Sequence, residues 1–250
     1  MKKLITTLIL MLPFVAMAAG GGIELDSADT DITDNASLQR GAKHFVTYCL
    51  GCHSAKHIRY IRMATDFDIT EDVMLNDIAP EGSTIYDVMN TAMNAHDSER
   101  WFGITPPDLS LIARSRGKDW LYTYLRSFYV DKSKVLGVNN VVLKDVGMPN
   151  PFWQLQGLQR PVYKNISGRE MLTSLKLAKP GTMSSKEFDG VVNDLVNFLV
   201  YVGEPHQLER IRMGKYVLFY ILMFIVVAYL LKKEYWKDVH KKETPWSSLR

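Results

Sequence analysis

The stretch Cys49-Leu50-Gly51-Cys52-His53 contains both cysteines of the chain, and the fold can be predicted outward from it. A C-x-x-C-H run is typical of covalent c-type haem attachment, in which both thiols bond to the haem and the histidine binds the iron. A zinc site would need a second Cys/His pair at matching spacing, which the sequence lacks. A thioredoxin-like dithiol would need a βαβ pattern and no histidine. The motif therefore predicts Cys49 and Cys52 as attachment residues and His53 as one axial ligand.

Residues 1–18 have the features of a secretory signal peptide. A basic pair and an apolar stretch over 4–15 precede Ala16 and Ala18, which form a small-x-small cleavage signal. The stretch is too short and wrongly flanked for a spanning helix. We therefore expect export, which agrees with the attachment of c-type haem on the exported side of bacterial membranes.

A second apolar run, from Tyr216 to Leu231, carries no charged residue. At 1.5 Å per residue it covers about 24 Å, slightly less than the ~30 Å hydrocarbon core of a bilayer. The alkyl stems of Lys215 and Lys232 can extend it by snorkelling. A buried core helix is the alternative, but such helices have shorter apolar runs. We expect a transmembrane anchor over residues 213–232.

These two segments divide the chain into a signal peptide, an exported haem domain over 19–212, the anchor, and a tail over 233–250. The tail has an excess of lysine and arginine over acidic residues, which is typical of the cytoplasmic side. Basic residues also precede the anchor, so the orientation rests on the signal peptide. The haem domain is expected in the periplasm, the anchor in the bacterial inner membrane, and the tail in the cytoplasm.

Charge is distributed unevenly, although the formal net charge is only +3. The stretches 24–34 and 66–99 contain many Asp and Glu residues and no Lys or Arg. A solvated acidic surface is one interpretation. A surface that steers a basic partner is the other, and single docking residues are not assigned.

Apolar residues recur at helical spacing over 37–49 and 120–128, which predicts two helices. A third helix begins at the capping box Ser184-x-x-Glu187 and ends at the stretch 203–205. Gly/Pro-rich turns separate these helices. Period-two alternation is scarce apart from a possible short hairpin over 138–146. The predicted fold class is mainly α, wrapped around a cofactor.

The second axial position of the iron needs its own ligand. A methionine thioether is soft and neutral, and it raises the reduction potential. Met148 and Met183 both lie on Pro/Gly-punctuated loops that can present a side chain rigidly. Most methionines fill cores, and local pattern does not separate these two. The histidine alternatives are His44, His57, His96 and His206.

Over almost its whole mature length the chain resembles the cytochrome c1 family, the haem subunits of the quinol:cytochrome c oxidoreductase (bc1 complex, complex III). C-x-x-C-H alone indicates only a c-type cytochrome, whereas the Pro-Pro-Asp-Leu-Ser block with a single C-terminal anchor is specific. The segments that carry the resemblance are 49–54, 100–110, 146–149, 181–184, 203–205 and 212–214.

The resemblance implies a class I-like cytochrome c domain with loop insertions plus one C-terminal transmembrane helix. It implies one covalent haem c whose iron is bound by His53 and Met148, with Met183 in a packing role. Gly41 and Phe45 resemble the helix-crossing pair of class I cytochromes, in which the glycine permits close contact.

The central block of the family implies further haem contacts. Arg116 resembles the arginine that pairs with a haem propionate, as a guanidinium can pair with a carboxylate in bidentate fashion. Arg114, two residues earlier, could match the same family arginine, so the assignment between the two stays open. Pro106 and Pro107 resemble the prolines that pack against the haem face.

By resemblance, the function is electron transfer within ubiquinol–cytochrome c reductase. The Rieske iron–sulfur protein would donate an electron and a cytochrome c would accept it. Cytochrome b and the membrane are the other expected partners, the complex is expected to be a dimer, and no nucleic acid is involved. The chain would be an enzyme subunit without catalytic residues of its own. The rivals are another membrane-anchored cytochrome c, such as an oxidase subunit or shuttle, and a haem peroxidase or gas sensor with an open axial site.

Overall fold

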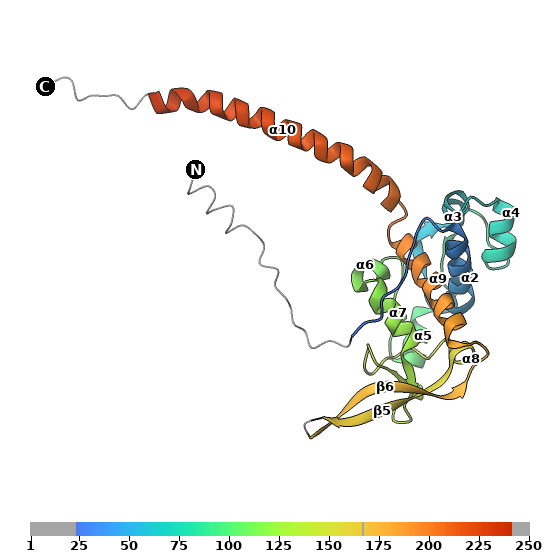
Figure 1. Cartoon of the computed structure of the whole chain (residues 1–250). Coiled ribbons are helices and arrows are strands. Elements are labelled where there is room, and N and C mark those ends of the chain that lie inside the picture. Colours follow the sequence, from blue (N-terminus) through green and yellow to red (C-terminus); the bar gives the residue numbers. More distant parts are fainter. Residues whose placement is uncertain (1–23, 167, 242–250) are drawn as a thin grey trace.

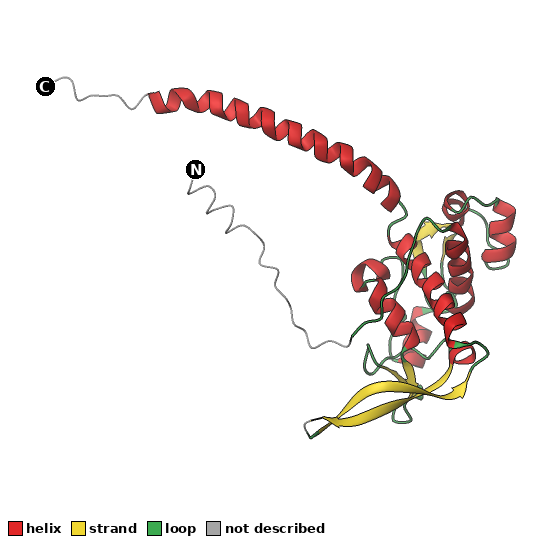
Figure 2. Ribbon diagram, viewed as in Figure 1, coloured by secondary structure: helices red, strands yellow, loops and turns green. Residues whose placement is uncertain are grey.

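The computed structural model describes residues 24–166 and 168–241. A helical body stands at the centre, a two-stranded ribbon projects from one end of it, and a long helix leaves from the other end (Figure 1, Figure 2). The predicted signal peptide and the last residues of the predicted tail lie outside the described residues.

Helices form most of the regular structure, so the mainly α class is confirmed. The helices are α2 (Asn35–Tyr48), α3 (Tyr60–Asp66), α4 (Glu71–Val73), the π-helix η1 (Met74–Ile78), α5 (Ala95–Phe102), α6 (Ile112–Arg116), α7 (Lys118–Arg126), α8 (Trp153–Gln156), α9 (Ser185–Gly203) and α10 (Gln207–Lys241). Three antiparallel strand pairs complete the fold: β1 (Ala55–Arg59) with β2 (Val88–Met89), β3 (Phe128–Val130) with β4 (Val138–Asn140), and β5 (Gly157–Ile166) with β6 (Arg169–Pro180).

Helices α2 and α9 cross in close contact at Gly41. A Cβ added at Gly41 would lie 2.1 Å from the carbonyl oxygen of Asp194 and 2.7 Å from Cβ of Phe198. Phe45, one turn further along α2, packs its ring against that of Phe198 with centroids 5.7 Å apart. The Ser37 hydroxyl donates to the Asp194 carboxylate at 2.7 Å and closes the crossing with a polar contact. The helix-crossing role expected for Gly41 and Phe45 is confirmed.

The predicted capping box begins α9. The Glu187 N–H donates to Ser184 Oγ at 3.4 Å, and the Ser184 N–H donates to the Glu187 carboxylate at 2.8 Å. These bonds satisfy two backbone donors that a helix start would otherwise leave unpaired. The apolar face of the helix is buried, and the helix ends at Gly203 as predicted.

Two expectations about β-structure were wrong. Residues 138–146 do not form a hairpin, because only β4 is extended there and it pairs with β3. The second predicted helix stops at Arg126, and Phe128 begins β3 instead. The long β5–β6 ribbon was missed. Register shifts beside Leu158/Gln159 and Val162/Tyr163 interrupt the alternation by which a strand is recognised.

Glycines close the base of the β5–β6 ribbon. Gly157 has φ 94°, and a Cβ there would lie 2.2 Å from the carbonyl oxygen of Lys179. A Cβ at Gly181 would lie 2.2 Å from the carbonyl oxygen of Leu155. The two strand ends can therefore approach as closely as their backbones allow.

Helix α10 is long and apolar enough to cross a membrane. Its candidate span covers Gln207–Lys237. The most apolar 18-residue window of this span has a mean hydropathy of 2.1, and none of the window is buried against the rest of the described chain. The anchor expected over 213–232 lies inside this helix, which continues beyond it at both ends.

The α2–α9 contact can be tested by adding one methyl group. Gly41→Ala should lower the free energy of unfolding by about 1–3 kcal/mol, because the helices must move apart to admit the Cβ. The matched control is Gly190→Ala, on the exposed part of α9, where a Cβ meets nothing within 4 Å. There alanine should stabilise the helix by up to about 1 kcal/mol. Thermal unfolding of the detergent-solubilised variants, followed by circular dichroism, measures both; an undiminished Tm for Gly41→Ala would contradict the close crossing.

Candidate functional site

The C-x-x-C-H motif forms a turn at the C-terminal end of α2. The Cys49 N–H still donates to the Phe45 carbonyl at 2.9 Å, as in a helix. The N–H groups of Cys52 and His53 then both donate to the Cys49 carbonyl, at 2.9 and 2.8 Å. This turn places the two thiols and the imidazole on one short segment that α2 anchors in the core.

A backbone carbonyl orients the His53 ring. His53 Nδ1 lies 2.8 Å from the carbonyl oxygen of Pro107, so Nδ1–H donates and the lone pair of Nε2 is left for a metal. Burial lowers the pKa of His53, although the Pro107 carbonyl and the Asp108 carboxylate act in the opposite direction. The side chain is only 9% exposed. The neutral imidazole required for metal binding is therefore the favoured form.

The block around Pro107 is itself fastened to the segment after the motif. The Leu109 N–H donates to the Ser54 carbonyl at 2.7 Å, and the Lys56 N–H donates to the Asp108 carboxylate at 3.1 Å. Burial tends to raise the pKa of Asp108, but hydrogen bonds from Ser110 and Lys56 outweigh it and lower that pKa. The ionised Asp108 carboxylate therefore joins the two segments through its hydrogen bond from Lys56. Sequence reasoning assigned Pro107 a packing role and missed its carbonyl, which no side-chain pattern reveals.

The two cysteines are protonated thiols. Burial raises the pKa of Cys49 to about 12 and also raises that of the half-buried Cys52. A redox dithiol or a zinc ligand needs a thiolate, which a positive environment and exposure favour. Among the described residues, no group of three or more His, Cys, Asp or Glu side chains could hold a metal ion. The geometry therefore argues against the dithiol and zinc alternatives.

Met148 packs half-buried against the core, and its sulfur has a polar neighbour. The Tyr124 hydroxyl, from α7, donates to Met148 Sδ at 3.3 Å. Beside it, a Cβ on Gly147 would lie 3.0 Å from Cγ2 of Ile104 and 3.4 Å from the carbonyl oxygen of Phe102. The methionine loop therefore lies directly against the start of the 100–110 block.

The same block thus reaches both candidate ligands. Its Phe102 end contacts the loop that carries Met148, and its Pro107 end holds the ring of His53. A further contact joins the end of α2, next to Cys49, to the segment that follows Met148. The rings of Tyr48 and Phe152 pack edge to face there, with centroids 5.2 Å apart. The residues present fit a haem: two thiols, an imidazole with a free Nε2, and a thioether, held by one connecting segment.

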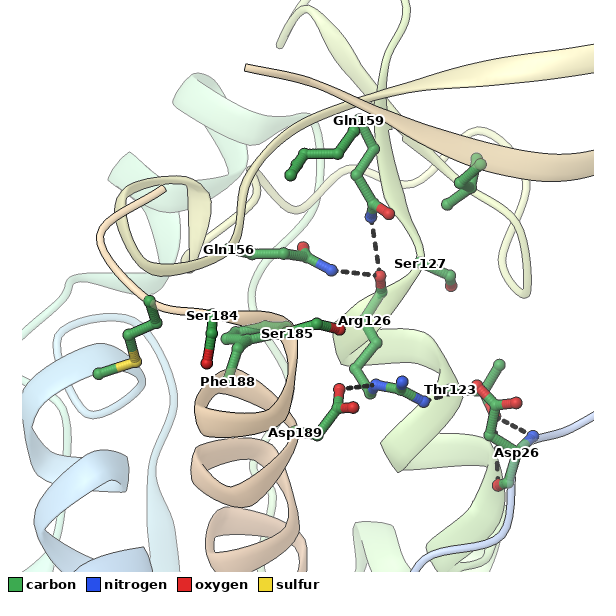
Figure 3. A pocket seen from close by; sticks show the side chains of 13 residues that line it. Asp26, Thr123, Arg126, Ser127, Gln156, Gln159, Ser184, Ser185, Phe188 and Asp189 are labelled. Carbon is green, nitrogen blue, oxygen red and sulfur yellow. Dashed lines mark hydrogen bonds and ion pairs between the residues drawn. The ribbon is translucent and has the colours of Figure 1, made fainter. Parts of the chain in front are cut away.

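The other candidate methionine lies elsewhere. Met183 lines a pocket of about 420 Å³ between α7, α9 and the base of the β5–β6 ribbon (Figure 3). Neither cysteine, nor His53, nor Met148 lines this pocket. Arg126 occupies it and forms ion pairs with Asp26 at 2.6 Å and Asp189 at 2.7 Å. The pocket is a junction between elements with a mixed lining, in which Met183 lies with Leu177 and Phe188 beside the polar side chains.

Asp26 shows that part of the acidic N-terminal stretch has a structural role. In addition to the Asp26–Arg126 pair, the Asn193 side chain donates to the Asp29 carbonyl, and Asp34 caps α2. The stretch 24–34 is therefore fastened across α7 and α9. Exposed carboxylates remain in both acidic stretches, for example Glu24 and Asp29 in the first and Glu71 in the second, so a structural role does not exclude a steering surface in either.

The structure separates the two arginines of the central block. Arg114 pairs with Glu204 at 2.7 Å and so links α6 to the end of α9. Arg116 is exposed, and its guanidinium carbon lies 5.2 Å above the Trp120 ring. Among the described side chains, no carboxylate forms an ion pair with Arg116, so its charge is available to a propionate. The geometry favours Arg116 over Arg114 as the candidate partner of a propionate.

Known proteins match this chain along nearly its whole length. The model of the Cytochrome C1 family matches residues 83–239. A cytochrome c1 of Allochromatium vinosum is 47% identical over 96% of this chain and 100% of its own length. A protein of Nitrosomonas europaea named ammonia monooxygenase gamma subunit is 46% identical over 96% of this chain and 99% of its own. A cytochrome c1 of Rhodospirillum rubrum is 24% identical over 93% of this chain and 94% of its own.

The matches confirm the resemblance carried by the central and C-terminal blocks. They imply a haem c cofactor, electron transport and a membrane-bound complex, and α10 supplies an apolar helix of the required length. The chain therefore belongs to the cytochrome c1 family, the haem c subunits of bc1 complexes.

Proposed function

We propose that this chain carries electrons from the Rieske iron–sulfur protein to a cytochrome c within a bacterial ubiquinol–cytochrome c reductase. The observation that carries the proposal is the pair of neutral candidate ligands, His53 and Met148, held by one segment of the chain. An imidazole and a thioether together favour a six-coordinate iron with a raised reduction potential.

A c-type haem bound here supplies a one-electron redox centre. Cys49 and Cys52 would attach it covalently, His53 Nε2 and Met148 Sδ would bind the iron, and Arg116 would neutralise a propionate. The chain's own task is to hold these groups still, because a rigid ligand set changes little between oxidation states.

The buried titratable groups around the site support electron transfer rather than proton chemistry. Burial raises the pKa of the Tyr124 hydroxyl, so it stays protonated near neutral pH, and Cys49 would have no ionisable thiol once it is bonded to the haem. The pKa of His53 is lowered, and its Nδ1 is already engaged by the Pro107 carbonyl. None of these groups is poised as a general acid or base. The chain would contribute to the enzyme as its electron-transfer subunit.

The length and apolar character of α10 support a membrane anchor, and the orientation proposed here follows from the sequence. The haem domain would lie in the periplasm, the anchor over 213–232 would cross the inner membrane, and the tail over 233–250 would lie in the cytoplasm. The anchor would hold the domain beside cytochrome b and within reach of the Rieske protein. A dimeric complex follows from the family alone.

Purification of the tagged chain from its own membranes in mild detergent tests the proposal. Copurifying b-type haem, an iron–sulfur subunit and quinol:cytochrome c reductase activity are the expected results. A c-type spectrum without b haem, under conditions that preserve membrane complexes, would favour a free-standing anchored cytochrome. Carbon monoxide binding to the reduced wild-type protein would favour an open axial site and hence a peroxidase or sensor.

The ligand assignment predicts different behaviour for two methionine variants. Met148→Leu should remove the sixth ligand, lower the reduction potential, and allow carbon monoxide to bind the reduced iron. Met183→Leu, which changes a thioether in the Arg126 pocket, should leave the potential and spectrum unchanged. Redox titration and carbon monoxide difference spectra measure both. The reverse pattern would transfer the assignment to Met183, and no change in either variant would point to a histidine.

The two arginines of the central block should also separate experimentally. Arg116→Gln should lower the midpoint potential, because a positive charge beside a propionate disfavours the more positive ferric state. Arg114→Gln should leave the potential unchanged and cost at most about 1 kcal/mol of stability, because the Arg114 side chain is more than half exposed and Glu204 keeps Arg210 as a second partner. Spectroelectrochemistry and thermal unfolding of both variants check this. A potential that responds to Arg114→Gln but not to Arg116→Gln would assign the propionate-pairing role to Arg114 instead.

A further inference from the structure

We infer that Tyr124 is a positioning residue: its hydroxyl fixes the sulfur of Met148 and raises the reduction potential of the site. The inference rests on the proposed function, because it takes Met148 as the sixth ligand of the iron. It adds a residue from α7, outside the motifs by which the sequence was interpreted, to the control of the redox centre.

The contact itself is specific. The Tyr124 hydroxyl donates to Met148 Sδ at 3.3 Å, within the range for a hydrogen bond to sulfur. A thioether sulfur has two lone pairs, so it can accept this bond and still bind a metal with the other. Burial raises the pKa of Tyr124, so the phenol keeps its proton and acts as a donor. The bond therefore determines which lone pair of Met148 remains for the iron.

The ring of Tyr124 is held from both sides. It stacks on Trp120 with centroids 4.9 Å apart and planes 10° from parallel, and it meets Phe128 edge to face at 5.2 Å. The Asn140 side chain, from β4, donates to the Tyr124 carbonyl at 2.8 Å and fixes the backbone below the ring. With the ring and backbone fixed, the hydroxyl has little freedom to point elsewhere.

Breaking this bond while the hydroxyl remains would be costly at this depth. Tyr124 is only 8% exposed, and Met148 Sδ is the hydroxyl's one hydrogen-bond partner among the described residues. A buried donor without a partner costs free energy, because little water can reach it to replace the bond. The arrangement therefore maintains the position of the sulfur as well as that of the tyrosine.

The sign of the effect on the potential follows from the direction of the O–H dipole. Its positive end points at the sulfur and draws electron density away from it. The thioether then donates less strongly to ferric iron, whose higher charge gains most from donation. The ferrous state is favoured, and the potential rises, as groups beyond the first ligand shell are known to tune metal sites.

The test compares two tyrosines that follow one another closely on α7. Tyr124→Phe removes the hydroxyl and keeps the ring that stacks on Trp120. The control, Tyr122→Phe, removes a hydroxyl from a ring that packs over the Arg126 guanidinium at 4.5 Å. Tyr124→Phe should shift the ferric/ferrous equilibrium towards ferric by about two- to tenfold, a tenfold change being about 59 mV. The potential of the Tyr122→Phe protein should not change.

Optical spectra of the ferric proteins distinguish failure of this inference from failure of the proposed function. The weak long-wavelength band of iron–thioether ligation should persist in Tyr124→Phe at a shifted position. If Tyr124→Phe keeps the band but its potential is unchanged or higher, the role of Tyr124 is overturned and Met148 remains the ligand. Absence of the band from the wild type would overturn the ligand assignment itself.

A measurement on the wild type keeps the inference testable if Tyr124→Phe does not accumulate. Resonance Raman spectra of the reduced protein in H2O and in D2O, after full exchange, report on a proton bonded to the sulfur. A shift of the iron–sulfur stretching frequency in D2O is expected. Identical frequencies in the two solvents would overturn the hydrogen bond.

Discussion

The hydrogen bond between His53 Nδ1 and the Pro107 carbonyl is the contact on which the rest of the site depends. It fixes the tautomer and the orientation of the imidazole, and it also fastens the C-x-x-C-H turn to the 100–110 block. Without it, the buried ring would lose its one hydrogen-bond partner among the described residues, and the Nε2 proposed to bind the metal would have no fixed direction. The bond uses a backbone carbonyl, so it constrains the path of the chain more than the identity of residue 107.

From that contact, the 100–110 block connects the two halves of the site. At one end it meets the Gly147–Met148 loop. At the other end its Leu109 N–H donates to the Ser54 carbonyl, and its Asp108 carboxylate accepts from the Lys56 N–H. Behind it, the crossing of α2 and α9 at Gly41 forms the rigid base from which the cysteines emerge. The two proposed axial ligands are thus positioned through backbone contacts, whereas Tyr124 contacts Met148 through its side chain.

Local chemistry was largely predictable from the sequence, and long-range geometry was not. The capping box of α9, the helix into Cys49 and the apolar anchor follow from spacing within a short window of sequence. The proposal of Met148 rather than Met183, and of Arg116 rather than Arg114, rests on contacts between distant segments, such as the Arg114–Glu204 pair. The β5–β6 ribbon escaped detection because its register shifts interrupt the alternation of side chains. The carbonyl of Pro107 and the hydroxyl of Tyr124 leave no local signature.

The central claim is that one imidazole and one thioether from this chain complete the coordination of a single haem iron. X-ray absorption at the iron edge of the purified, oxidised protein tests it most directly, because sulfur and nitrogen scatter differently in the first shell. The account predicts one sulfur among six first-shell atoms, since the cysteine sulfurs attach to the haem and do not bind the iron. Six nitrogen atoms, or five atoms and an open position, would contradict it.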